Sequence, residues 1–408
     1  MKKAITALLI GAGQRGSQSY APYALEHPGE LRFVGVAEPK DFLREGFAAA
    51  HDISPAHIYF DYKEAFAAGK IADCVLICTQ DNDHVAPALA ALDAGYRHIL
   101  LEKPISKDAK ECASLKDKAA KLDAKIMVCH SLRYTNFYRK MREIIARGDI
   151  GELCAMTHIE GVGFSHQAHS FVRGDWRNAK ESSPMILAKC CHDIDLILYL
   201  TGKRCKSVSS FGSLQHFTEK NAPKNTPERC IEGCAIGGEC PYNALTIYKN
   251  DPHFRQIAIE KEGHLSFTDA MEKGPYGRCV YKCDNDVVDR QVVSLLLEDG
   301  VTVTHTMTAF TKRIGRETCI FGTRGELQGN LEEGRITVYD FLQGGVTEYT
   351  IPCGSSGHSG ADETMIREFV RMVQRDEKSI SDISLSVESH QICLAAEDAR
   401  LKKNVINL

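Results

Sequence analysis

Residues 8–16 read Leu8-Leu9-Ile10-Gly11-Ala12-Gly13-Gln14-Arg15-Gly16, a G-x-G-x-x-G motif between an apolar run and a helix-period stretch. Gly11 permits a tight turn, Gly13 lets the backbone approach a pyrophosphate, and Gly16 allows the helix to pack closely on the strand. The N-terminus of that helix then faces the phosphates. In this setting the motif predicts a loop that binds a dinucleotide. The alternative is an ordinary α/β turn without a cofactor.

Glu38 bears on which dinucleotide is bound. It ends the second apolar run, 22 residues after the last glycine of the motif, where an acid accepts hydrogen bonds from the adenosine ribose. Because its charge disfavours a 2′-phosphate, the sequence predicts NAD rather than NADP. Lys40 and Arg44 follow closely and soften this preference. Gln14 and Arg15, between the glycines, are expected to contact NAD as well.

The first part of the chain alternates short apolar runs with helix-period stretches. Strands are expected at 6–10, 32–37, 74–78, 98–101 and 125–129, and helices at 14–26, 41–51, 83–94 and 108–122. Continuous apolar strands that alternate with helices are typical of a doubly wound parallel sheet. The sequence therefore predicts an α/β fold with a Rossmann domain over residues 1–129.

The pattern changes after residue 150, where longer strand-like runs are joined by turns. Strands are expected at 153–162, 207–217, 287–297, 301–310, 319–327 and 335–341, and helices at 193–199, 362–373 and 387–402. This pattern predicts an α+β domain over 130–408 with a large, mainly antiparallel open sheet. Residues 218–285 are polar and rich in Pro, Gly and Cys, and are expected to form an irregular insertion loop.

Composition excludes several other classes of protein. The 408 residues carry 50 Lys and Arg against 54 Asp and Glu, so the net charge of −4 argues against nucleic acid as a main partner. No apolar run reaches the roughly 18 residues that a membrane span needs. The apolar start at 4–10 leads into the glycine motif and is expected to be a strand rather than a secretion signal. The 16 scattered cysteines favour reduced thiols and a cytoplasmic location.

Four further segments carry a family resemblance. They are Leu101-Glu102-Lys103-Pro104, Ile77-Cys78-Thr79 followed by His84, Gly148-Asp149-Ile150-Gly151, and Cys191-His192-Asp193-Ile194-Asp195. With the glycine motif, they make the chain resemble the glucose–fructose oxidoreductase / inositol dehydrogenase / rhizopine-catabolism (Gfo/Idh/MocA) family over nearly its whole length.

The resemblance implies an NAD-dependent oxidoreductase that acts on a secondary hydroxyl of a sugar, glycoside or cyclitol. It also implies cofactor contacts from Thr79, His84, Glu102 and Lys103, and a cis peptide between Lys103 and Pro104. The sheet of the second domain often serves as a dimer face in this family, so a homodimer or homotetramer is expected.

Two side chains are the main candidates for catalysis. Lys103 follows a parallel strand, at the edge where open α/β sheets bind ligands, and a lysine there holds a hydroxyl and stabilises alkoxide charge. His192 heads a helix and titrates near neutrality, so it can take the hydroxyl proton as hydride leaves. Dehydrogenases of the family commonly carry an aspartate four residues earlier, where this chain has Ala188. Lys189 either replaces part of that role or is structural.

Further polar residues are expected to contact the substrate. Arg133 and Tyr134 follow the strand at 125–129, and Asp195 lies in the segment of the catalytic histidine. A dense polar and aromatic loop adds His166, His169, Arg173 and Trp176, the only tryptophan of the chain. A flat indole suits a sugar face, whereas the alternative for Trp176 is a place in the core.

A cluster of cysteines in the insertion suggests a structural metal. Cys230, Cys234 and Cys240 lie close in sequence, and Cys279 is preferred to Cys283 as a fourth ligand. Four thiolates are a usual ligand set for structural zinc. The alternatives are an iron–sulfur cluster, free thiols, or incidental disulfides formed after purification.

Two other functions remain open. A redox-neutral glycosidase oxidises a ring hydroxyl, eliminates the aglycone, adds water and returns the hydride. The missing aspartate and the changed segment from Ala188 to Cys191 favour this alternative. A non-catalytic NAD-binding regulator is less favoured, since Lys103 and His192 are both present.

Overall fold

The computed structural model describes residues 3–260, 263, 266–352, 354 and 357–408. These residues form two compact units, each built from separate stretches of the chain. The first unit comprises Met1–Leu153, Cys191–Arg204 and Phe321–Leu394, and the second comprises Cys154–Cys190, Cys205–Ile320 and Ala395–Leu408. The domain boundary between residues 129 and 130 stays a prediction.

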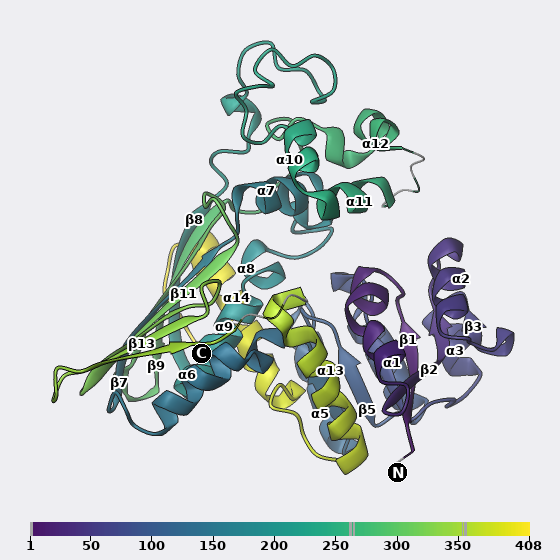
Figure 1. The fold of residues 1–408 in the computed structure, drawn as a ribbon, viewed down its shortest axis with the longest axis horizontal. Helices are drawn as coiled ribbons and strands as arrows, with labels where there is room; N and C mark the ends of the chain where they lie inside the picture. Colours follow the sequence, from purple (N-terminus) through teal and green to yellow (C-terminus); the bar gives the residue numbers. More distant parts are fainter. Residues whose placement is uncertain (1–2, 261–262, 264–265, 353, 355–356) are drawn as a thin grey trace. The chain divides into compact units, whose positions relative to one another are not determined.

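A parallel sheet forms the centre of the first unit, as the strand–helix alternation predicts (Figure 1). Its order is β3-β2-β1-β4-β5-β6, and every pairing within it is parallel. The strands are β1 (Ile5–Ile10), β2 (Leu31–Ala37), β3 (Ile58–Tyr59), β4 (Cys74–Ile77), β5 (His98–Leu101) and β6 (Lys125–Val128). The Rossmann prediction is thereby confirmed, with the short β3 as an edge strand that the sequence pattern missed.

Both faces of this sheet are covered, which explains why its strands are apolar throughout. Leu9 joins one buried cluster and its neighbours Leu8 and Ile10 join the other. Phe369 of α13 lies in the cluster of Leu9, and Val387 of α14 lies in the other. Segments far along the chain therefore complete the core around a sheet made of early strands.

Most helices of the first unit fall in the predicted ranges, whereas the helices at Tyr62–Ala67 and Asn136–Ala146 lie in stretches for which none was predicted. The helices are the π-helix η1 (Gln14–Tyr20), α1 (Pro22–Glu26), α2 (Asp41–Ala50), α3 (Tyr62–Ala67), α4 (Val85–Asp93), α5 (Ala109–Lys121), α6 (Asn136–Ala146), α9 (Cys191–Thr201), α13 (Gly357–Arg375) and α14 (Ile383–Lys402), which continues into the second unit. The single helix expected over 14–26 is in fact two, because Ala21 bonds back to Gly16 in a π turn just before Pro22.

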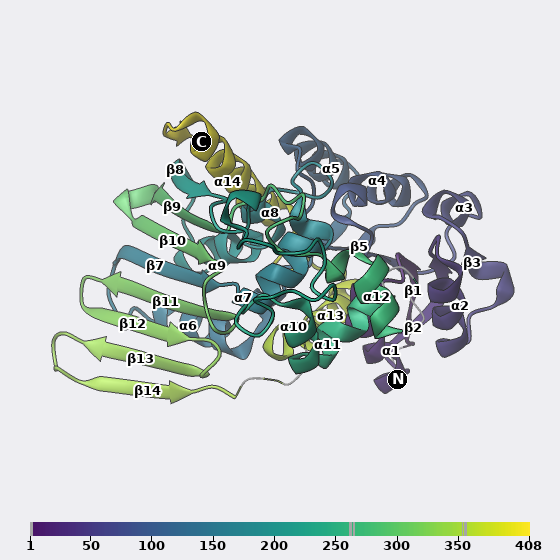
Figure 2. The same cartoon turned by 90° about the horizontal axis from the view of Figure 1, so that it is seen from above.

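The second sheet has nine strands in the described part of the chain (Figure 2). Its order is β14-β13-β12-β11-β7-β10-β9-β8-β15. The strands are β7 (Leu153–Gly161), β8 (Cys205–Ser213), β9 (Arg290–Leu297), β10 (Thr302–Thr308), β11 (Gly315–Gly322), β12 (Gly325–Asn330), β13 (Arg335–Asp340), β14 (Val346–Thr350) and β15 (Ile406–Asn407). The sheet is mainly antiparallel, as predicted, although β7 and β10 run parallel.

One predicted strand is wrong in detail. The run at 319–327 is not continuous, because Thr323 and Arg324 donate their N–H groups to the carbonyls of Glu152 and Ile150 and form a turn. The chain reverses there into β11 and β12.

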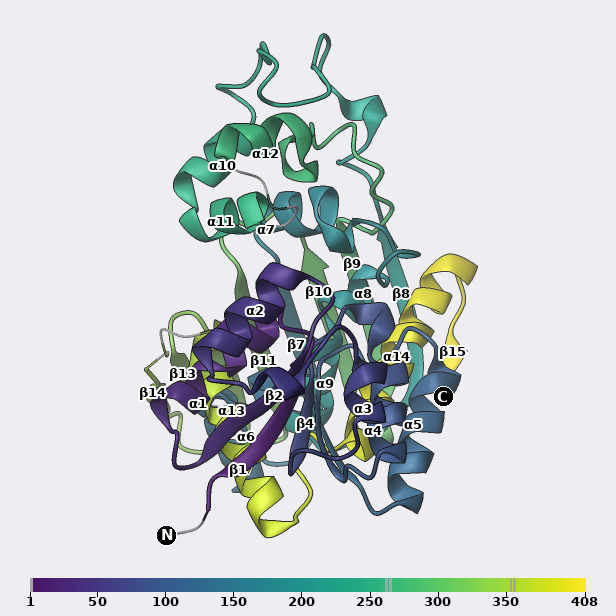
Figure 3. The same cartoon turned by 90° about the vertical axis from the view of Figure 1, so that its right-hand side faces the viewer.

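The insertion at 218–285 is only in part the irregular loop that its composition predicts, because its middle is helical (Figure 3). It carries α10 (Ala244–Asn250), α11 (Pro252–Glu260) and α12 (Phe267–Lys273), and the second unit also contains α7 (Phe164–His166) and α8 (Met185–Ala188). Aromatic side chains such as Tyr248 and Tyr276 give these helices a core of their own. Their periodicity was hard to detect because each helix is shorter than three turns.

Among the described residues, no helix is both long and apolar enough to cross a membrane.

Candidate functional site

Two glycines of the motif, Gly11 and Gly16, occupy positions that leave no room for a side chain. Gly11 has φ +89°, and a Cβ there would lie 2.6 Å from the Cys78 carbonyl oxygen. A Cβ on Gly16 would lie 2.5 Å from the Gly11 oxygen, so the helix packs directly on the turn. A Cβ on Gly13 would meet no atom within 4 Å. The backbone at Gly13 is therefore open to an approaching group, as a dinucleotide loop requires.

Glu38 is held beside this loop by hydrogen bonds. Its Oε2 accepts from the N–H of Ala12 at 2.9 Å and its Oε1 from the N–H of Lys40 at 3.0 Å. Arg44 donates to the Glu38 carbonyl at 2.7 Å and pairs with Asp41 at 2.5 Å. The Arg44 guanidinium is thus engaged by the residues that follow β2.

Glu102 anchors the start of the loop after β5. Its Oε1 accepts from Arg15 Nε at 2.9 Å and from the Tyr20 hydroxyl, and its Oε2 from the N–H of Lys103 at 3.0 Å. Burial opposes ionisation, but the Arg15 and Lys103 charges hold the pKa of Glu102 below its usual value. Arg15 also pairs with Asp362 at 3.0 Å. The contacts of Arg15 are thus structural, and its cofactor contact stays a prediction.

The peptide between Lys103 and Pro104 is cis, which confirms the expectation from the family resemblance. Two histidines hold this loop in place. Nδ1 of His84 lies 2.5 Å from the Pro104 carbonyl oxygen, and Nε2 lies 3.1 Å from the Thr79 carbonyl oxygen. His390 Nε2 accepts from the N–H of Ile105 at 2.8 Å. The segment that carries Lys103 is therefore fixed on both sides.

His192, at the start of α9, is buried near a second histidine. The ring of His130 lies 5.9 Å from that of His192 and 5.7 Å from that of His390. His130 Nε2 stands 3.6 Å from Asp195 Oδ1. Arg133 binds both oxygens of Asp195, at 2.5 and 2.6 Å. Three imidazoles and one buried ion pair thus share a single part of the first unit.

The electrostatics of this group link it to Lys103. Burial, together with the Arg133 and Lys103 charges, holds the pKa of His130 well below its usual value. Burial and the neighbouring His130 lower the pKa of His390 to about 3, so this ring stays neutral and donates through Nδ1 to the Ser386 carbonyl. Because the ammonium of Lys103 acts on both rings, the lysine and the histidines form one electrostatic group.

Arg133, Tyr134 and Asp195, which were predicted to contact substrate, are buried and paired within the first unit. The Tyr134 hydroxyl hydrogen-bonds with the Ser379 and Ser381 hydroxyls at 2.7 and 2.8 Å. Contact of the three residues with substrate stays a prediction.

Lys189 belongs to the second unit and forms an ion pair there. Its Nζ lies 3.2 Å from Oε1 of Glu160, a fully buried carboxylate that also pairs with Arg316 at 2.9 Å. Of the two roles that the sequence left open for Lys189, this pairing favours the structural one.

The other predicted substrate residues also lie in the second unit. His169 is stacked between Phe254 and Tyr276, with centroid distances of 4.2 and 4.5 Å. Arg173 is fully buried. The ring centroids of His166 and Trp176 lie 5.6 and 6.2 Å from that of Phe171. His169 and Arg173 thus belong to a buried aromatic and polar core, whereas His166 and Trp176 are only half-buried. Contact of these four residues with substrate stays a prediction.

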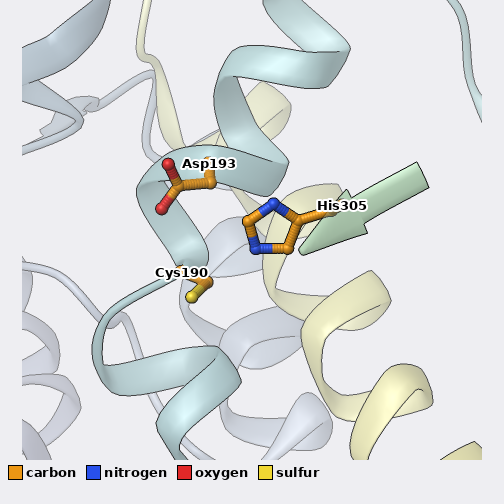
Figure 4. Close-up of side chains that lie close together, drawn as sticks. All are labelled: Cys190, Asp193 and His305. Atoms are coloured by element: carbon orange, nitrogen blue, oxygen red, sulfur yellow. The ribbon is translucent and has the colours of Figure 1, made fainter. Parts of the chain in front are cut away.

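One group of potential metal ligands does not include any cysteine of the insertion. Cys190 Sγ and a ring nitrogen of His305, both in the second unit, lie within 4.8 Å of one another. Figure 4 draws them together with Asp193, which follows Cys190 by three residues.

Sequence reasoning missed His130, His390, Tyr20 and Asp362. His130 follows the strand at 125–129 directly, so the rule that ligands bind at the carboxyl ends of parallel strands was a usable clue. His390 and Asp362 lie more than 250 residues from the loops that they hold, and no local pattern marks them.

Comparison with known proteins identifies two matching family models. Residues 5–130 match the model described as an oxidoreductase family with an NAD-binding Rossmann fold. Residues 138–328 match the GFO/IDH/MocA C-terminal domain.

Individual relatives are distant. A Bacillus subtilis (strain 168) protein named as an oxidoreductase, YteT, is 22% identical over 314 residues, which cover 72% of this chain and 71% of YteT. The inositol 2-dehydrogenase of Rhizobium meliloti (strain 1021) is 27% identical over 202 residues, or 50% of this chain and 56% of that enzyme. The structure of a levoglucosan dehydrogenase in complex with NADH and levoglucosan aligns with a TM-score of 0.75 and 17% identity over 99% of both chains. At that identity the likeness shows a shared fold.

Proposed function

This chain belongs to the GFO/IDH/MocA family of NAD-binding oxidoreductases, and we propose that it transfers a hydride between NAD and a secondary hydroxyl of a sugar, glycoside or cyclitol. The substrate class is supported by the names of an inositol dehydrogenase and a levoglucosan dehydrogenase among its relatives. Within the chain, the proposal depends most on one observation: Lys103 and the buried histidines share the unit that carries the glycine loop.

The loop fits a dinucleotide in two respects. The open backbone at Gly13 leaves room for a pyrophosphate, and Glu38 keeps acceptor capacity for ribose hydroxyls beyond its two backbone hydrogen bonds. Thr79 and His84 lie on the turn after β4, the neighbouring strand of the sheet. Gln14 is also assigned to this cofactor site. When bound, NAD supplies the hydride acceptor for the oxidation of an alcohol.

We assign proton transfer and charge stabilisation to two side chains. His192 takes the proton of the substrate hydroxyl as a general base. Lys103 donates a hydrogen bond to the same oxygen and stabilises its developing negative charge. His130 and the Asp195–Arg133 pair act through these groups by keeping the buried cluster neutral and ordered. Lys189 has no assigned step, since its ammonium is paired with Glu160.

Three broader expectations remain part of the proposal. The cell compartment is the cytoplasm. The four cysteines hold a structural metal that supplies no step of hydride transfer. The chain assembles as a homodimer or homotetramer through the large sheet, because β8 and β9 expose the apolar side chains Phe211, Val292 and Leu296 on one face.

The proposal is tested by incubating the purified protein with NAD⁺ and a panel of sugars, cyclitols and chromogenic glycosides. We expect NADH to accumulate with at least one polyol or sugar. Release of an aglycone without net NADH would replace the dehydrogenase with the redox-neutral glycosidase. Tight NAD binding with no turnover on any compound would favour a regulatory NAD-binding protein.

A further inference from the structure

The insertion of the second unit gathers four cysteines around one small cavity. Its wall includes Cys230, Cys234, Cys240, Cys279 and the side chain of Arg173. Cys230 and Cys279 are 49 residues apart in sequence. An isolated antiparallel β-bridge between Arg229 and Arg278 places the two cysteines on neighbouring backbone segments. The N–H of Cys230 donates to the Gly277 carbonyl at 2.9 Å, and that of Cys279 to the Glu228 carbonyl at 2.8 Å. The four cysteines that were predicted as metal ligands thus line the same cavity.

A compact turn brings the other two cysteines to this cavity. Cys240 donates its N–H to the Ile236 carbonyl at 2.9 Å, and Gly237 donates to the Cys234 carbonyl at 2.9 Å. Asn243 closes the same turn, since its Nδ2 donates to the Gly237 carbonyl at 2.9 Å. The fifth cysteine, Cys283, is not part of the wall.

Arg173 brings a buried positive charge to the cavity. Its side chain is fully buried, with Nε 2.7 Å from the Arg278 carbonyl and Nη2 2.7 Å from the Tyr242 carbonyl. Nη2 also lies 3.6 Å from Cys230 Sγ. Among the described residues, Nη1 has no hydrogen-bond partner and no carboxylate pairs with this guanidinium. The groups that act most strongly on this buried guanidinium are the Tyr248 hydroxyl and the thiols of Cys230 and Cys283, so a further negative charge in the cavity would be stabilised by it.

We propose that Cys230, Cys234, Cys240 and Cys279 bind one Zn²⁺ ion as thiolates, with Arg173 donating to the sulfur ligands from outside. Each thiol releases its proton on binding, so four thiolates and one Zn²⁺ carry a net charge of −2, which Arg173 partly offsets. An all-sulfur tetrahedral set is typical of zinc or iron. The cavity holds about 10 Å³, roughly the room of one water molecule, which suits a single ion better than an iron–sulfur cluster.

Binding requires a small closure of the site. In a filled tetrahedral site the sulfurs stand about 3.8 Å apart, given a Zn–S distance of about 2.3 Å. Among the described residues, no three of these sulfurs lie within 4.8 Å of one another. The four side chains must therefore turn inward around the ion, which would tie the backbone on both sides of α10, α11 and α12 together.

The test uses the full chain, purified under reducing conditions without added metal. Elemental analysis should find about one zinc per chain, and a chelator that removes it should lower the melting temperature. Replacement of the native ion by Co²⁺ should give the absorption bands of tetrahedral cobalt thiolate. Cys279→Ser should abolish zinc retention, whereas the matched variant Cys283→Ser should keep it. Arg173→Met should retain zinc about 10- to 100-fold less tightly against a chelator, as for loss of an outer hydrogen-bonding partner.

Three results would overturn the proposal: folded wild-type protein that contains iron or no metal, a Co²⁺ spectrum without thiolate bands, or equal loss of zinc in Cys279→Ser and Cys283→Ser. The cobalt spectrum is recorded on the wild type, so it decides the question even if Cys279→Ser does not fold.

Discussion

Each unit of the molecule buries a group of histidines beside an arginine, but the rings have different neighbours. In the first unit, His130 lies 5.9 Å from His192 and 3.6 Å from the Asp195 carboxylate, and Lys103 acts on its charge state. Here the imidazoles meet ionisable groups on a loop that follows a parallel strand, and such surroundings are typical of sites that move protons.

In the second unit, His169 instead lies flat between Phe254 and Tyr276, and Nδ1 is 3.1 Å from the Tyr248 hydroxyl. Arg173 donates to backbone carbonyls and faces thiols. Similar residue types therefore lie in a packed aromatic core in one unit and among ionisable groups in the other. The difference lies in what surrounds the rings rather than in the residues themselves.

The largest expected effect is that of Lys103→Met. The variant keeps the length of the side chain but loses the charge that stabilises an alkoxide, so kcat should fall by at least about 10²-fold. Lys189→Met is the matched control, because it removes an ammonium that is paired with Glu160. Steady-state kinetics should show a much smaller change in kcat for Lys189→Met, with a lower melting temperature. Equal losses of kcat would contradict the distinction between the two units.

His192→Ala should come next. Loss of a general base typically lowers the rate about 10²- to 10⁴-fold, and the effect should appear in kcat, with the Kd for NAD almost unchanged. His169→Ala provides the comparison from the second unit, where melting temperature should be affected more than kcat. If His192→Ala turned over its best substrate at a near-normal rate, the base would have to be sought among other histidines.

The cofactor loop shows how much of the site could be predicted locally. Gly11, Gly13, Gly16 and Glu38 all lie within one strand–helix–strand segment, where spacing determines geometry, and their arrangement matches the prediction. The cis peptide after Lys103 followed from a short motif in the same way.

The residues that complete the site could not be predicted in this way. Asp362 and His390 come from α13 and α14 and act on loops near Arg15 and Ile105 through tertiary contacts alone. The helices of the insertion were missed because short segments stabilised by aromatic packing have little periodicity to detect.

Glu38→Ala should have a smaller effect, on the choice of dinucleotide. The carboxylate should bind ribose hydroxyls and disfavour a 2′-phosphate, so its loss should weaken NAD binding by about 10-fold or more, the equivalent of one charged hydrogen bond. Binding of NADP should weaken less or improve. Titration of both dinucleotides measures the ratio, and equal affinities in the wild type would contradict the preference for NAD.

The smallest effect concerns stability and pH. Burial, with the nearby Arg173 charge, lowers the pKa of His169 to about 3, against about 6.5 in the unfolded chain. The unfolded state then binds the proton more readily, so this contribution to stability is fully present above pH 6.5 and is lost as the pH falls toward 3. In His169→Phe, which keeps the ring stack, the free energy of unfolding should decline less between pH 7 and pH 5. An unchanged slope from chemical denaturation would show that His169 is not the neutral, buried ring described.

The central claim, that the first unit transfers a hydride to NAD from a polyol or sugar, is tested most directly by isotope transfer. The protein is mixed with NAD⁺ and a substrate deuterated at its carbinol carbons, and the dinucleotide is recovered for mass spectrometry. The account predicts deuterium in NADH formed by the wild type, and very little from Lys103→Met at equal NAD occupancy. NADH without deuterium, or the same yield of labelled NADH from both proteins, would contradict it.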